Sequence, residues 1–122
     1  MEKNKDKVYL PYGTHLIFDM SGCDTRELDD LEHLANVLTE AANVSGMHII
    51  SKLKTKFKPS GVSIILQLEE SHMTVHTYPL FGMAMFDIFT CGDKDALAAF
   101  SLIVNKVRHE YVILNKMARG VK

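Results

Sequence analysis

Polar and apolar side chains alternate along residues 71–78, which is the pattern of a β-strand whose two faces meet different surroundings. The side chains on one face would be Ser71, Met73, Val75 and Thr77, and those on the other His72, Thr74, His76 and Tyr78. Two histidines, a threonine and a tyrosine are poor material for an apolar core. The second face is therefore predicted to be a polar site or an interface.

Other segments of the chain show the same strand character, and two show helical spacing. Strands are predicted at 14–20, 47–57, 62–69, 83–90 and 110–114, with turns at Ser21-Gly22, Lys58–Gly61 and Pro79–Gly82. Asp24, with Glu27 three residues later, predicts the capping box of a helix that ends near Gly46. A second helix is expected at about 94–108. We therefore expect an α+β fold: a two-layer sandwich with a mainly antiparallel sheet and two helices packed on one face.

Composition limits the classes of protein that fit. With 122 residues, 47% apolar and 24% charged, the chain is expected to form a single domain over 1–122. A net charge of −1 gives no electrostatic reason to expect nucleic acid or a membrane surface as a partner. No apolar run reaches the length of a membrane span, and the charged N-terminus does not lead into a signal peptide. Two cysteines are too few for a disulfide framework, so we expect a cytoplasmic protein.

Residues that carry chemistry gather in the second half. The run Glu70-Ser71-His72 is followed by His76-Thr77-Tyr78-Pro79 and then by Asp87 and Thr90-Cys91-Gly92. This pattern resembles the self-processing site of the small prokaryotic S-adenosylmethionine decarboxylases, which carry Glu-Ser-His-x-x-x-His-Thr-Trp-Pro-Glu followed by Asp-x-x-Thr-Cys-Gly. The resemblance covers most of the chain and is most specific over 61–92. Two positions depart from the family: Tyr78 replaces Trp and Leu80 replaces Glu.

The resemblance implies that the chain cuts itself. In the family, the serine corresponding to Ser71 attacks the carbonyl of the residue before it, here Glu70, with Ser63 as the matching oxyanion donor. His76 is the matching base that removes the Ser71 α-proton. The products would be a β chain, 1–70, and an α chain, 71–122, with a covalent pyruvoyl cofactor derived from Ser71.

The resemblance also implies a reaction and an assembly. The pyruvoyl group would form a Schiff base with the amine of S-adenosylmethionine and serve as the electron sink while carbon dioxide leaves. Cys91 is the matching proton donor, and the product would supply aminopropyl groups for spermidine synthesis. Phe57, Tyr78 and Leu80 are expected near the substrate. Family members form homodimers of processed protomers.

Several alternatives stay open at the level of sequence. The loss of Glu at position 80 also suits a decarboxylase of ornithine or arginine on the same scaffold. A non-catalytic regulatory homologue is a second possibility. A metal site formed by His72, His76, Asp87 and Cys91 is a third, but it leaves Glu70-Ser71 without a role, and we expect no metal. We expect structural roles for Cys23, His15, His33, His48 and His109, and positions in the core for Met83 and Met85. The role of His72 is undecided.

Overall fold

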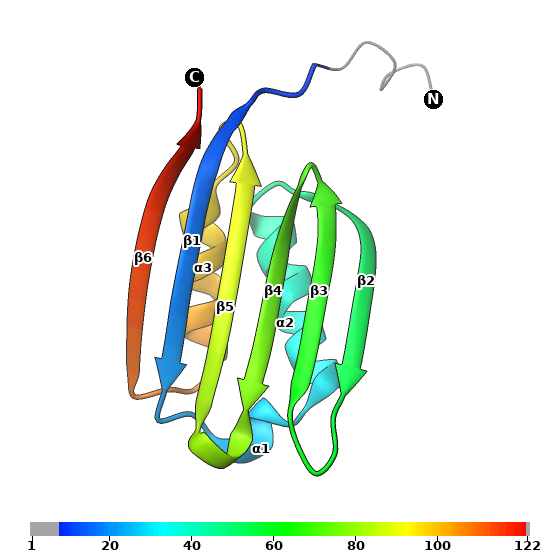
Figure 1. The fold of residues 1–122 in the computed structure, drawn as a ribbon, viewed down its shortest axis with the longest axis vertical. Helices are drawn as coiled ribbons and strands as arrows, with labels where there is room; N and C mark the ends of the chain where they lie inside the picture. The colour runs from blue at the N-terminus through cyan, green and yellow to red at the C-terminus, as the bar shows by residue number, and fades with distance from the viewer. Residues whose placement is uncertain (1–7, 122) are drawn as a thin grey trace.

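A six-stranded antiparallel sheet forms one layer of the protein, and helices cover one of its faces (Figure 1). The computed structural model describes residues 8–121. The strand order is β2-β3-β4-β5-β1-β6. The strands are β1 (Tyr12–Ser21), β2 (His48–Lys56), β3 (Val62–Glu69), β4 (Ser71–Tyr78), β5 (Met83–Cys91) and β6 (Tyr111–Gly120). The predicted α+β sandwich with a mainly antiparallel sheet is confirmed.

The core lies between the sheet and two long helices, α2 (Leu31–Val44) and α3 (Ala96–Lys106). Figure 1 shows both helices behind the same face of the sheet. Alternation sends every second strand residue into this layer, as Leu16 and Phe18 of β1 illustrate. The opposite face carries no helix among residues 8–121, and we refer to it as the open face. No helix within the described part of the chain is long and apolar enough to cross a membrane.

The first predicted helix is divided in two. Asp24 caps α1 (Thr25–Leu28) by accepting the Arg26 and Glu27 N–H groups, as predicted. Glu27 does not complete the capping box, because its carboxylate contacts His33 and the Arg108 N–H instead. The first helix ends before Asp29, whose carboxylate binds the β2–β3 turn. Asp30 caps a new helix, α2, through the His33 N–H.

The contacts of Asp29 with the β2–β3 turn explain why the predicted helix is interrupted there. Its Oδ1 accepts the Gly61 N–H at 2.7 Å and pairs with Lys56 Nζ at 2.8 Å. The contact with the Lys56 ammonium and the Gly61 hydrogen bond lower the pKa of the Asp29 carboxyl. Both partners are about thirty residues away, so helical spacing alone does not reveal them.

Two other sequence expectations differ from the structure. The last strand is longer than the predicted 110–114, because β6 pairs with β1 along its whole length as an exposed edge strand and so lacks an apolar pattern. The second difference concerns a methionine. Met85 is 39% exposed and lies on the open face, so the prediction that it belongs to the core is wrong. Ala84 and Phe86 occupy the buried face on either side of it. Met83 is half-buried at the start of β5.

Candidate active site

The β3–β4 hairpin places the Glu70–Ser71 peptide at one end of the sheet. Leu68 pairs with Ser71, so Glu69 and Glu70 make the turn between the strands. Ser71 Oγ donates a hydrogen bond to the Glu70 carbonyl oxygen at 2.7 Å. The serine hydroxyl therefore already lies against the carbonyl that it would have to attack in self-cleavage. Ser71 is half-buried, and the N-terminal segment approaches the same turn, where Tyr9 hydrogen-bonds Glu69.

Cys91 lies beside this turn at the end of β5. Its Sγ is 4.0 Å from the Glu69 carbonyl oxygen. Glu70, Phe89, Cys91 and Arg119 line a cavity of about 370 Å³ at this end of the sheet. Gly13 pairs with Cys91 on one side and with Arg119 on the other, so no side chain separates these two residues across the sheet. A Cβ at Gly13 would collide with the Thr90 carbonyl, which explains the glycine. We call Glu70, Ser71 and Cys91 the upper group.

Ser63 and His76 form a second pair on the open face. They are register partners in β3 and β4, and Ser63 Oγ lies 2.7 Å from His76 Nδ1. Either atom can donate in this hydrogen bond, depending on the histidine tautomer. We call Ser63 and His76 the lower group, because they lie toward the opposite end of β4 from Ser71.

The two groups do not meet within one chain. His76 is five residues beyond Ser71 on β4, a separation of about 17 Å at the usual rise of a strand. The spacing is odd, so alternation also directs the two side chains to different faces of the sheet. Of the site residues expected from the sequence, the structure therefore places Glu70, Ser71 and Cys91 at one end of the sheet and Ser63 and His76 toward the other. Cys91 shares the open face with His76, whereas the Ser71 side chain starts on the other face.

The residues expected near the substrate lie at the lower end. Phe57 follows β2, Tyr78 ends β4, and Leu80 lies in the short helix η2 (Pro79–Phe81). All three are exposed, and Tyr78 and Leu80 line a cavity of about 160 Å³. Figure 1 shows these element ends at the bottom of the sheet, opposite the β3–β4 hairpin.

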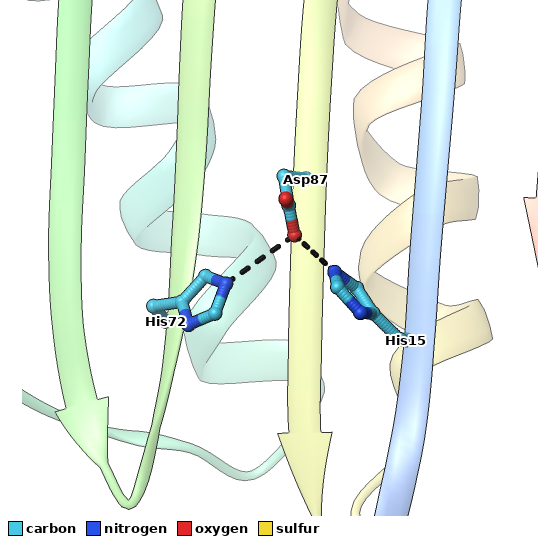
Figure 2. A group of neighbouring side chains, drawn as sticks. All are labelled: His15, His72 and Asp87. Carbon is cyan, nitrogen blue, oxygen red and sulfur yellow. Dashed lines mark hydrogen bonds and ion pairs between the residues drawn. The ribbon is translucent and has the colours of Figure 1, made fainter. Parts of the chain in front are cut away.

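A third group, His15, Asp87 and His72, crosses three adjacent strands of the open face (Figure 2). Asp87 Oδ1 is 2.6 Å from His15 Nε2 and 3.3 Å from His72 Nε2. His15 was expected to be structural, and the sequence offers only a weak indication of this group. Alternation in β1 places His15 on the face opposite Leu16, but the strand order that brings it to Asp87 is not a local property.

Several other polar or titratable side chains have structural roles. The Thr77 hydroxyl is buried and joins β3, β4 and α1 by accepting the Val62 N–H and donating to the Leu28 carbonyl. Cys23 is buried, and burial raises the pKa of its thiol to about 11. His33 pairs with Glu27, and His109 bonds the Val107 carbonyl. These contacts agree with the structural roles expected for Cys23, His33 and His109.

The metal site considered from the sequence does not form. His76 pairs with Met85, six residues before Cys91 on β5, so these two proposed ligands lie near opposite ends of the sheet. Among residues 8–121, the only group of three metal-capable side chains within ligand distance is His15, His72 and Asp87.

Comparison with known proteins assigns the chain to a family. The family model described as S-adenosylmethionine decarboxylase matches residues 14–120. An S-adenosylmethionine decarboxylase proenzyme 2 of Bacillus cereus is 37% identical over 114 residues, which is 93% of each chain. A proenzyme of Thermococcus gammatolerans is 35% identical over 90% of this chain and 78% of its own.

The similarity extends to three-dimensional structure. The crystal structure of the adenosylmethionine decarboxylase from Aquifex aeolicus superposes with a TM-score of 0.85 at 27% identity. The match covers 93% of this chain and 94% of that one. From the family model, the relatives and the shared fold together, this chain belongs to the S-adenosylmethionine decarboxylase family.

Proposed function

We propose that this protein is a pyruvoyl-dependent S-adenosylmethionine decarboxylase that activates itself by cutting the Glu70–Ser71 bond. The observation that carries the proposal is the 2.7 Å contact of Ser71 Oγ with the Glu70 carbonyl oxygen, in a chain of this family. A serine on a hairpin turn, with its hydroxyl against the preceding carbonyl, is the residue from which a pyruvoyl group can form. In the cytoplasm, the product would supply aminopropyl groups for spermidine synthesis.

Self-cleavage follows from the chemistry of that contact. Ser71 Oγ attacks the Glu70 carbonyl carbon and the C–N bond breaks, which moves the acyl group from nitrogen to oxygen and leaves an ester. Removal of the Ser71 α-proton expels the Glu70 carboxylate by β-elimination. Water then hydrolyses the dehydroalanine, releasing ammonia and leaving a pyruvoyl group at the start of residues 71–122.

The Ser63–His76 hydrogen bond suits both steps if one tautomer is present. When His76 Nδ1–H donates to Ser63 Oγ, the lone pair of Nε2 is free to take the α-proton. The Ser63 hydroxyl hydrogen is then free to bind the oxyanion formed by Ser71 attack. A single arrangement of the lower group therefore provides the base and the oxyanion donor.

The separation of the two groups points to a homodimer as the active form. The open face exposes the large apolar side chains Leu53, Ile65, Met85, Ile113 and Met117. Several large apolar side chains exposed on one face of a sheet favour an interface. A two-fold axis between facing sheets and perpendicular to the strands would bring the upper end of each subunit to the lower end of the other.

In such a dimer, Ser63 and His76 of the partner subunit would face the hairpin turn that holds the Glu70–Ser71 bond, on the side where Cys91 lies. The Ser71 side chain starts on the other face, so the partner's residues would act on the peptide bond at the end of the sheet. Each dimer would hold two composite sites. The pyruvoyl group supplies the carbonyl that takes up the substrate amine and accepts electrons as carbon dioxide leaves. Cys91 lies in the cavity beside Glu70 and can return a proton to the substrate α-carbon.

We propose S-adenosylmethionine as the first candidate substrate. The relatives' names indicate S-adenosylmethionine. Leu80 is 80% exposed and supplies no carboxylate where the family pattern has Glu. The absence of a hydrogen-bonding carboxylate costs about 1–3 kcal/mol of substrate affinity. That deficit favours ornithine or arginine as the second candidate, because neither carries a ribose.

Intact-mass spectrometry of the purified protein tests self-cleavage. We expect two fragments, 1–70 and 71–122, the second without a free amine, whereas the Ser71→Ala variant should remain one chain. Release of labelled carbon dioxide from S-adenosylmethionine, ornithine and arginine, assayed side by side, identifies the substrate. A wild-type protein that stays uncleaved on long incubation and still decarboxylates any of the three would contradict the pyruvoyl mechanism.

A further inference from the structure

His15, Asp87 and His72 direct three possible metal ligands toward one point on the open face (Figure 2). Their ligand atoms, two imidazole Nε2 atoms and one carboxylate oxygen, all lie within 4.8 Å of one another. The residues come from β1, β5 and β4, which are adjacent strands held by continuous ladders. Their backbones are therefore fixed relative to one another before any ligand binds.

The distances suit a small divalent cation. Two ligands of a tetrahedral zinc ion, each about 2.1 Å from the metal, lie about 3.4 Å apart. The contact of Asp87 with His72, at 3.3 Å, already has this spacing, and the contact with His15, at 2.6 Å, has to open by less than 1 Å. The two imidazole nitrogens lie within 4.8 Å of each other, so they have to approach by at most about 1.4 Å to reach the same spacing. Movements of this size are within reach of side-chain rotations.

We propose that His15, His72 and Asp87 form a binding site for a divalent transition-metal ion such as Zn²⁺ or Co²⁺. Two imidazoles and one carboxylate suit these ions, whereas Mg²⁺ and Ca²⁺ prefer sets made entirely of oxygen. The side chains of His15, Asp87 and His72 are 12%, 36% and 42% exposed. Three protein ligands leave one coordination position, and in the proposed dimer this position faces the partner subunit, so that water or a partner side chain would fill it. His72 directly follows Ser71, but none of the three ligands is assigned a step in self-cleavage or decarboxylation.

Arg119 competes with the metal for His15. Its Nη1 lies 3.3 Å from His15 Nδ1, and its guanidinium lies 5.3 Å above the Phe89 ring. Because arginine only donates, this contact requires a lone pair on Nδ1 and leaves the His15 proton on Nε2, facing Asp87. A metal bound through Nε2 moves that proton to Nδ1, which can then no longer accept from Arg119.

Metal binding should therefore displace Arg119. Arg119 is an exposed residue of the edge strand β6, so it can leave at little structural cost. It also lines the cavity that contains Glu70 and Cys91, so occupancy of the metal site would alter one wall of that cavity. Because of this competition, removing the Arg119 guanidinium should strengthen metal binding, an effect that is not expected of an accidental cluster of histidines.

The test is a titration of the tag-free, full-length protein with Co²⁺, monitored by the visible absorption of the protein-bound ion. We expect saturable binding of one ion per chain. His15→Gln, His72→Gln and Asp87→Asn should each weaken binding at least about tenfold. His48→Gln removes an exposed histidine outside the group and should have no effect. Circular dichroism verifies that each variant is folded.

Arg119→Gln supplies the independent arm of the test, because the expected change is a gain. Loss of the guanidinium removes both the competing hydrogen bond and a positive charge, so Co²⁺ should bind more tightly than to the wild type. Three results would overturn the proposal: no saturable absorption at millimolar Co²⁺, equal binding by folded His15→Gln and His72→Gln variants, or weaker binding by Arg119→Gln. All titrations are made in the Ser71→Ala background, in which the chain stays uncut next to His72, so that these readouts do not depend on self-cleavage or on decarboxylase activity.

Discussion

Replacing Thr77 by valine should destabilise the protein strongly although the two side chains have nearly the same shape. Thr77 is only 6% exposed, and its hydroxyl accepts the Val62 N–H at 2.9 Å and donates to the Leu28 carbonyl at 2.7 Å. Valine fills the space but leaves both backbone groups buried without this partner. A buried backbone group that loses its hydrogen-bond partner lowers the stability by about 1–3 kcal/mol. We therefore expect the free energy of unfolding to fall by about 2–4 kcal/mol.

Denaturant unfolding in the Ser71→Ala background measures this loss on one uncut chain at a fixed protein concentration. Thr77→Ser is the matched control, because it keeps both hydrogen bonds and loses one methyl group, which costs about 1 kcal/mol. A Thr77→Val protein as stable as Thr77→Ser would refute the assignment of Thr77 as a buried link between β3, β4 and α1.

Three further predictions concern the chemistry of the site. His76→Ala should stall at the ester stage, because the Ser71 α-proton is not removed, and hydroxylamine should then release fragments 1–70 and 71–122; an uncut chain after this treatment would place His76 earlier in the reaction. Iodoacetamide at neutral pH should label Cys91 and spare Cys23, because burial raises the pKa of the Cys23 thiol to about 11 and keeps it protonated well above neutral pH; peptide mapping that finds Cys23 labelled first would contradict this. Leu80→Glu should lower the KM for S-adenosylmethionine about tenfold if a carboxylate at this position binds the substrate, and an unchanged KM would show that Leu80 lies outside the substrate site.

The sheet and the long helices could be predicted because their signals are local. Alternation along 62–69 and 71–78, with turn residues between segments, is enough to predict strands. The break at Asp29 could not be predicted, because the helix ends there in response to Gly61 and Lys56, residues of a distant hairpin. Spacing predicts that Glu27 completes a capping box, yet its carboxylate contacts His33 and the Arg108 N–H, which the fold brings near.

In the candidate site, too, local signals could be predicted and contacts between distant residues could not. The motif identifies Ser71 and Cys91, and the structure places them at one end of the sheet. The group formed by His15, Asp87 and His72 depends on β1 lying beside β5, and 72 positions separate His15 from Asp87 in the chain. A motif conveys which residues belong to a site but not how far apart they lie, and the separation of Ser71 from His76 follows only from the length and alternation of β4.

Mixing two inactive variants tests the composite site most directly. Ser71→Ala lacks the nucleophile but keeps His76, and His76→Ala keeps Ser71 but lacks the base. Coexpression should produce mixed dimers in which the Glu70–Ser71 bond of the His76→Ala chain is cut by His76 of the partner subunit. Mass spectrometry should then show fragments 1–70 and 71–122 from that chain alone, whereas each variant expressed by itself yields no pyruvoyl-bearing fragment. Mixed dimers, confirmed by native mass spectrometry, that remain entirely uncut would contradict the proposal that the two subunits share each site.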